Sequence, residues 1–80
     1  MEELAEVFLK LKSKEEVIEF LKGLLTPKEL QEIPKRLQIV KLLKKGLPQR
    51  EIAKKLKVSI ATVSRGSNEI KRGRFRVVGS

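Results

Sequence analysis

Hydrophobic residues recur at helical spacing along most of the chain, and short polar segments separate these repeats. Residues 2–11 carry the first apolar stripe, made of Leu4, Val7, Phe8 and Leu11. Ser13 and Glu16 have the spacing of a capping box, in which the side chains of both residues close the start of a helix. The helix that follows carries Val17, Ile18, Phe20, Leu21, Leu24 and Leu25, and we expect it to end near Gly23 or Leu24.

A longer helix is predicted to begin at Thr26-Pro27-Lys28-Glu29. Thr26 can cap the helix, Pro27 suits its first position, and Glu29 completes a second capping box. The apolar stripe comprises Leu30, Ile33, Leu37, Ile39, Val40, Leu42 and Leu43. Pro34 interrupts this pattern, so we expect a bend near residues 30–34 or a restart of the helix there. Lys44-Lys45-Gly46 marks its end.

Two shorter helices are predicted next, from Pro48 to about Leu56 and from Ile60 to about Arg72, with Ser59 as the cap of the second. Their apolar positions suit two short helices that cross steeply, as in a helix-turn-helix unit. Lys57 stands where the turn of such a unit usually has glycine, and a left-handed conformation there costs a lysine roughly 1 kcal/mol. Residues 73–80 lack a helical pattern, so we expect a disordered basic tail or a short extended arm.

Composition narrows the function. The chain has 80 residues, 40% of them hydrophobic and 36% charged, which is typical of one small globular domain. It contains no Cys and no His, so we predict no disulfide, no catalytic residues and no metal site, and an enzyme is the least favoured function. No apolar run is long enough to span a membrane, and the acidic first residues do not form a secretory signal. We therefore expect a cytoplasmic protein.

Charge is distributed unevenly. Residues 1–40 carry 7 Lys and Arg and 8 Glu, whereas residues 41–80 carry 12 Lys and Arg and 2 Glu. A basic half that contains a helix-turn-helix pattern indicates a surface for a polyanion, above all double-stranded DNA. An ordinary helical hairpin with a solvated charged face is the alternative.

In a helix-turn-helix unit the second helix enters the major groove of DNA and its first residues meet base edges. The residues predicted to contact bases, directly or through water, are Arg50, Ile60, Ala61 and Ser64. The residues predicted to contact phosphates are Gln49, Ser67, Asn68 and Lys71.

Several motifs resemble the bacterial Trp repressor family over about residues 24–71. They are Leu24-Leu25-Thr26-Pro27, Arg36 with Ile39-Val40, Gly46, Gln49-Arg50-Glu51, and the run Ile60-Ala61-Thr62-Val63-Ser64-Arg65-Gly66-Ser67-Asn68. The last run is the most specific, because a general helix-turn-helix lacks its Arg-Gly-Ser-Asn segment. The resemblance implies an all-α fold that forms an intertwined homodimer.

Within this single domain, the resemblance assigns residues 1–25 to dimerisation helices, 26–46 to a long central helix and 47–72 to the DNA-reading head. Residues 73–80 form the basic tail. A core of this size stabilises a chain by only about 3–5 kcal/mol without a disulfide or metal, which independently favours a dimer.

The resemblance also implies an L-tryptophan site between the central helix and the reading head. Arg36 and Arg65 would flank the indole ring, and Arg65 would pair with the carboxylate. Thr26 and Thr62 would line the pocket, and Gly66 would let the ring approach the backbone. Glu69 stands where the family has a small hydroxyl residue near the ligand's ammonium group. Its carboxylate would pair either with that ammonium group or with Arg65, four residues before it.

Three functional hypotheses follow. The first is a repressor of a tryptophan-related operon that binds a palindromic operator as a homodimer, with L-tryptophan as corepressor. The second is a regulator of the same kind that binds DNA without an effector, for which the Arg65–Glu69 pair is the argument. The third is a small helical module whose basic face binds an acidic protein.

Overall fold

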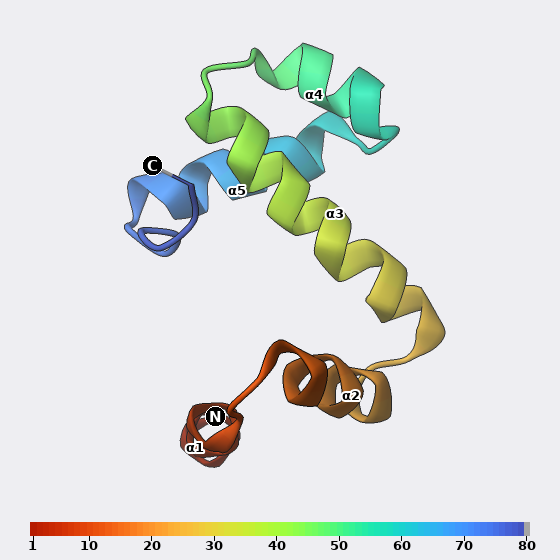
Figure 1. Cartoon of the computed structure of the whole chain (residues 1–80). Helices are drawn as coiled ribbons and strands as arrows, with labels where there is room; N and C mark the ends of the chain where they lie inside the picture. The colour runs from red at the N-terminus through yellow and green to blue at the C-terminus, as the bar shows by residue number, and fades with distance from the viewer. Residues whose placement is uncertain (80) are drawn as a thin grey trace. The chain divides into compact units, whose positions relative to one another are not determined.

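The structure is a computed structural model, and it describes residues 1–79. Five helices and no strand occur in this range (Figure 1). Their bounds are α1 (Glu2–Lys10), α2 (Lys14–Leu24), α3 (Pro27–Lys44), α4 (Gln49–Leu56) and α5 (Ile60–Lys71). The chain divides into two compact units, one of residues Met1–Gln31 and one from Glu32 onward. The all-α prediction is confirmed.

The first unit contains α1 and α2. Ser13 caps α2 by accepting a hydrogen bond of 3.1 Å from the backbone N–H of Glu16. The Glu16 carboxylate accepts a bond of 2.8 Å from the backbone N–H of Lys12, one residue before the predicted cap. The rings of Phe8 and Phe20 meet edge to face with their centroids 5.2 Å apart. Neither helix contains a buried residue, so this unit has no core of its own within one chain.

The start of α3 is the capping box that the sequence predicts. The Glu29 carboxylate accepts a bond of 2.9 Å from the backbone N–H of Thr26, and Thr26 Oγ1 accepts one of 3.2 Å from the N–H of Glu29. The backbone N–H of Thr26 and its hydroxyl, the latter over 3.1 Å, both donate to the Glu29 carboxylate, which favours the ionised form and lowers the pKa of Glu29. The stabilisation is therefore present above the carboxyl's ordinary pKa and is lost as the pH falls through the lowered value.

Pro34 lies inside α3 without ending it. The helix continues from Pro27 to Lys44, so the expected restart at Pro34 is wrong. A bend at this position stays a prediction. Gly46 follows the helix with a φ of +92°, in agreement with the predicted C-terminal signal.

The core lies in the second unit, where α4 and α5 pack against the C-terminal half of α3 (Figure 1). Its buried side chains are Ile39 from α3, Ile52 from α4 and Val63 from α5. Half-buried apolar residues surround them, namely Leu42, Leu43, Leu47, Ala53, Leu56 and Val58. The short helices α4 and α5, joined at residues 57–59, form the predicted helix-turn-helix.

Lys57 ends α4 in the left-handed conformation, with a φ of 57° and a ψ of 46°. We expect Lys57→Gly to raise the free energy of unfolding by about 0.5–1 kcal/mol, because relief of left-handed strain exceeds the added chain entropy of glycine. Lys55→Gly inside α4 is the matched control and should lower it by about 1 kcal/mol. Urea unfolding followed by circular dichroism measures both, and equal effects of the two substitutions would contradict the account of the turn.

The segment after α5 differs from the predicted tail. Residues 72–77 form successive turns, so the predicted disordered tail or extended arm is wrong for this part. Residue 80, the last of the predicted tail, lies outside the described residues. None of the helices described in residues 1–79 has the length and apolar character needed to span a membrane.

Candidate functional site

The exposed side of the helix-turn-helix carries most of the residues predicted to contact DNA. The side chains of Arg50, Ile60, Ala61, Asn68 and Lys71 are exposed, whereas Gln49, Ser64 and Ser67 are half-buried. From Glu32 onward the sequence holds 14 Lys and Arg and 3 Glu, so this unit is strongly basic. A basic helix-turn-helix with exposed donors has the chemistry needed to bind phosphate and base edges.

Two of the residues predicted to contact DNA, Gln49 and Ser64, are hydrogen-bonded to each other. The Ser64 hydroxyl on α5 donates a hydrogen bond of 2.7 Å to the side-chain carbonyl oxygen of Gln49 at the start of α4. This bond fixes the orientation of the Gln49 amide and leaves its nitrogen as a donor for a phosphate oxygen. The bond also ties the two helices of the reading head together.

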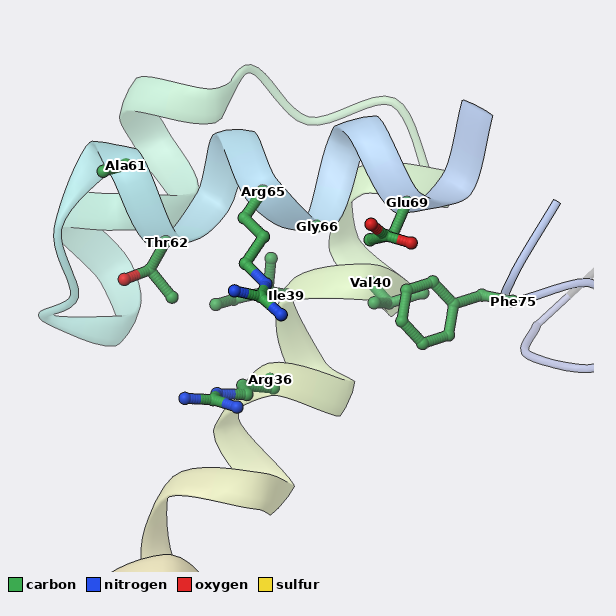
Figure 2. Close-up of a pocket in the computed structure, with 9 residues that line it drawn as sticks. All are labelled: Arg36, Ile39, Val40, Ala61, Thr62, Arg65, Gly66, Glu69 and Phe75. Atoms are coloured by element: carbon green, nitrogen blue, oxygen red, sulfur yellow. The ribbon is translucent and has the colours of Figure 1, made fainter. Parts of the chain in front are cut away.

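Behind the reading head lies a cavity of about 350 Å³, which is within the usual size of a small-molecule site (Figure 2). It is bounded by α3, α5 and the turn segment after α5. Its lining residues are Arg36, Ile39, Val40, Ala61, Thr62, Arg65, Gly66, Glu69 and Phe75. Five of the six residues predicted to bind a ligand therefore meet at one cavity, namely Arg36, Thr62, Arg65, Gly66 and Glu69.

Two arginines give this cavity its charge. Arg36 on α3 and Arg65 on α5 extend their guanidinium groups into the same space (Figure 2). Neither side chain forms an ion pair with any residue in the range 1–79. Because two positive groups that form no ion pair repel each other, an anionic group bound between them would be stabilised. The planar guanidinium groups also suit the faces of an aromatic ring.

Glu69 does not pair with Arg65. Its Oε1 lies 3.1 Å from a terminal nitrogen of Arg72, and its Oε2 lies 3.3 Å from Nε of Arg74. Both carboxylate oxygens thus face cations from the segment that follows α5. Arg65 therefore stays accessible to the cavity. The Arg65–Glu69 ion pair, which would favour a regulator without an effector, does not form in the described part of the chain.

Gly66 allows close packing of α5 on α3. A Cβ at this position would lie 3.2 Å from Cγ2 of Ile39 and 3.5 Å from Cδ1 of Leu43. The absence of a side chain at Gly66 thus lets α5 pack closely on α3, and these two helices line the cavity. This role is separate from the one predicted for Gly66 beside a ligand.

The hydroxyl of Thr62 faces the cap of α5. It lies 2.8 Å from the Ser59 hydroxyl, and the Thr62 backbone N–H donates to that same Ser59 oxygen over 3.1 Å. Thr26 belongs to the other compact unit, where its hydroxyl bonds to Glu29 as part of the capping box. A ligand contact by Thr26 stays a prediction.

Phe75 was not among the residues predicted to bind a ligand, and the same holds for Ile39, Val40 and Ala61, which also line the cavity. Phe75 lines the cavity beside Val40 and is half-buried (Figure 2). The available signal was Gly73, which follows the last turn of α5 and has a φ of +81°. Glycine at that position is typical of a chain that reverses at a helix end.

The sequence of this chain is similar to a known protein family. A family profile described as Trp repressor protein matches residues 1–76. The chain belongs to the Trp repressor family. Proteins of the Trp repressor family are helix-turn-helix transcription regulators and not enzymes, which agrees with the predicted class.

Curated relatives carry the name Trp operon repressor homolog. Those of Actinobacillus succinogenes and Pasteurella multocida are each 56% identical over 54 residues, 66% of this chain. The aligned part is 54% of the first relative and 53% of the second. The homolog of Mannheimia succiniciproducens is 57% identical over 49 residues, 60% of this chain and 48% of its own length. The chain thus spans about half the length of the curated relatives it matches. No solved structure gives a significant match.

Proposed function

We propose that this protein is a DNA-binding transcriptional repressor of a tryptophan-related operon, with L-tryptophan as its corepressor. The observation that carries the proposal is that α5 contributes residues to two surfaces, the exposed side of the helix-turn-helix and the cavity. Ile60 and Asn68 are exposed on α5 away from the cavity lining, while Thr62, Arg65 and Gly66 of the same helix line the cavity. A molecule in the cavity would therefore touch the helix that enters the groove.

The cavity suits an aromatic amino acid. The carboxylate would pair with Arg65, and the flat ring would lie between the guanidinium groups of Arg65 and Arg36. Ile39 and Val40 supply an apolar surface for the ring. The ligand would favour one setting of α5 relative to α3, and it can raise DNA affinity only by its preference for that setting.

We propose further that the protein binds its operator as a homodimer. The absence of buried residues in α1 and α2 supports this, because both helices carry exposed apolar side chains such as Leu9 and Ile18. A two-fold dimer would place two copies of α5 in successive major grooves about 34–36 Å apart, which requires a palindromic operator.

A basic module that binds an acidic protein is the remaining candidate of a different class. It would show no sequence preference on DNA, and any binding to DNA would depend only on charge and fall steeply with salt. A cavity against α5 whose two arginines form no ion pair with residues 1–79 favours the effector-gated repressor.

The test is selection of DNA from a pool of random duplexes by the purified protein, with and without L-tryptophan. The expected result is an enriched palindrome whose half-sites lie one helical turn apart, recovered only with the ligand. Enrichment of equal strength without the ligand would leave a repressor that needs no effector. Recovery of unrelated sequences in both conditions would overturn sequence-specific DNA binding.

Arg50→Ala provides a residue-level test on the selected duplex. Because Arg50 is exposed on α4 and predicted to meet a base edge, its loss should weaken binding roughly 10- to 100-fold and relax the preference at one base pair. Lys10→Ala removes one charge from the N-terminal unit and is the control. Fluorescence anisotropy at two salt concentrations measures both. Equal losses from the two substitutions would mean that Arg50 contributes charge alone.

A further inference from the structure

The chain reverses after α5 through a specific set of backbone bonds. The N–H of Gly73 donates to the carbonyl of Ile70 over 2.9 Å, and the N–H of Arg74 donates to the carbonyl of Glu69 over 3.1 Å. With Gly73 at a φ of +81°, these two bonds form a Schellman motif. Such a motif commonly joins its outer residues by an apolar contact, whereas here Glu69 and Arg74 form an ion pair of 3.3 Å.

Further contacts fasten this segment to both helices that bound the cavity. Arg72 adds a second ion pair to Glu69 over 3.1 Å, on α5. The ammonium group of Lys44, at the end of α3, donates a hydrogen bond to the backbone carbonyl of Phe75. Phe75 is thereby held from two sides, and its ring lines the cavity (Figure 2).

The cavity has two chemically different ends. Arg36 and Arg65 supply positive charge at one end, and Phe75 and Val40 supply an apolar surface at the other (Figure 2). Glu69 lies near the apolar end, but both of its oxygens already face arginines. Its carboxylate therefore fastens the segment that carries Phe75.

We propose that Phe75, held by the Glu69–Arg74 ion pair, forms the end wall of this cavity and limits the size of the aromatic ring that the cavity accepts. Glu69 is a positioning residue in this arrangement. The inference rests on the proposed function, because it concerns the selectivity of the same ligand site. The ligand class is an aromatic α-amino acid whose carboxylate pairs with Arg65 and whose ring, lying between the two guanidinium groups, turns its edge toward the Phe75 ring.

Calorimetric titration with L-tryptophan and 5-methyltryptophan tests whether Phe75 limits the size of the ring that the cavity accepts. The full chain should bind L-tryptophan and bind the methylated ring at least tenfold more weakly, because a filled apolar wall rejects an added methyl group. Phe75→Ala should weaken L-tryptophan binding by about tenfold and reduce the preference between the two ligands to less than about threefold. Phe75→Leu should retain most of both properties. Val77→Ala, at a side chain that is 97% exposed in the same segment, is the control and should change neither.

The ion pair has its own test. Arg74→Gln should weaken the preference for L-tryptophan over 5-methyltryptophan in the same direction as Phe75→Ala, because it releases the wall. Arg76→Gln removes the same charge from the same segment but no contact with Glu69, and it should leave the preference unchanged. A general loss of structure would appear as reduced helical circular dichroism, which these variants should retain.

The outcomes separate the two proposals. If the full chain binds neither amino acid, the corepressor proposal and the wall both fall. If it binds L-tryptophan but Phe75→Ala keeps the affinity and selectivity of the full chain, the wall alone falls. A tighter complex of Phe75→Ala with L-tryptophan would mean that the segment competes with the ligand, which also overturns the wall.

Discussion

Arg65→Ala should lower the affinity for L-tryptophan by roughly 10- to 100-fold and abolish the effect of the ligand on DNA binding. The physical reason is that Arg65 forms no ion pair with any residue in the range 1–79 and lies on a cavity it shares with Arg36. A hydrogen-bonded ion pair with a carboxylate stabilises a complex by about 1.5–3 kcal/mol, and this contribution disappears with the guanidinium group.

The conservative variant Arg65→Lys separates charge from shape. Lysine keeps the positive charge but lacks the planar group that lies against an aromatic ring, so we expect an intermediate loss of affinity. The fluorescence of the ligand itself measures binding, since the protein contains no Trp and no Tyr.

Arg50→Ala is the matched control for Arg65→Ala, because it removes an exposed arginine that does not line the cavity. It should weaken DNA binding and leave tryptophan binding intact, the opposite of the effect on the ligand expected for Arg65→Ala. Unchanged tryptophan binding by Arg65→Ala would show that the ligand site lies elsewhere.

The parts of the fold that local chemistry determines could be predicted from the sequence. The caps at Ser13, Thr26 and Ser59 depend on side chains that bond to backbone groups three residues away. The left-handed turn at Lys57 follows from the geometry of the helix-turn-helix unit. These features need no information about distant parts of the chain.

The arrangement around Glu69 could not be predicted in the same way. The helical spacing of Arg65 and Glu69 suggested an ion pair, but Arg72 and Arg74 compete for the same carboxylate. Arg74 reaches it only because Gly73 reverses the chain. The position of Phe75 likewise depends on this reversal and on Lys44, which lies 31 residues away in the sequence. Helical periodicity relates residues that are neighbours on one helix, so it does not predict contacts that depend on a chain reversal or on a distant residue.

At Pro34 the local preference of a residue predicted a disruption of the helix that the surrounding structure overrides. Proline removes one hydrogen bond and disfavours a helix interior, which predicted a bend or a restart. Tertiary packing can outweigh this cost, and the helix continues past Pro34 to buried Ile39 and Val40. The apolar stripe was therefore a better guide to the helix than its single unfavourable residue.

Ile52→Ala should have the largest effect on stability of any single truncation in the second unit. The Ile52 side chain is 0% exposed and packs with Ile39 and Val63, the other buried members of the core cluster. Truncation of a buried isoleucine lowers the free energy of unfolding by about 2–5 kcal/mol, through lost apolar burial and the cavity left behind. A core of this size gives the chain only a small free energy of unfolding, and the sequence has no cysteine to form a disulfide.

Ile60→Ala is the matched control, since Ile60 is 51% exposed at the start of α5. It should lower the free energy of unfolding by less than about 1 kcal/mol yet weaken DNA binding, because its side chain is among those predicted to meet bases. Thermal unfolding followed by circular dichroism at one fixed protein concentration measures both variants. Equal stability losses would mean that the buried cluster contributes no more than the exposed face, and that the packing of α4 against α3 and α5 is not what holds the reading head together.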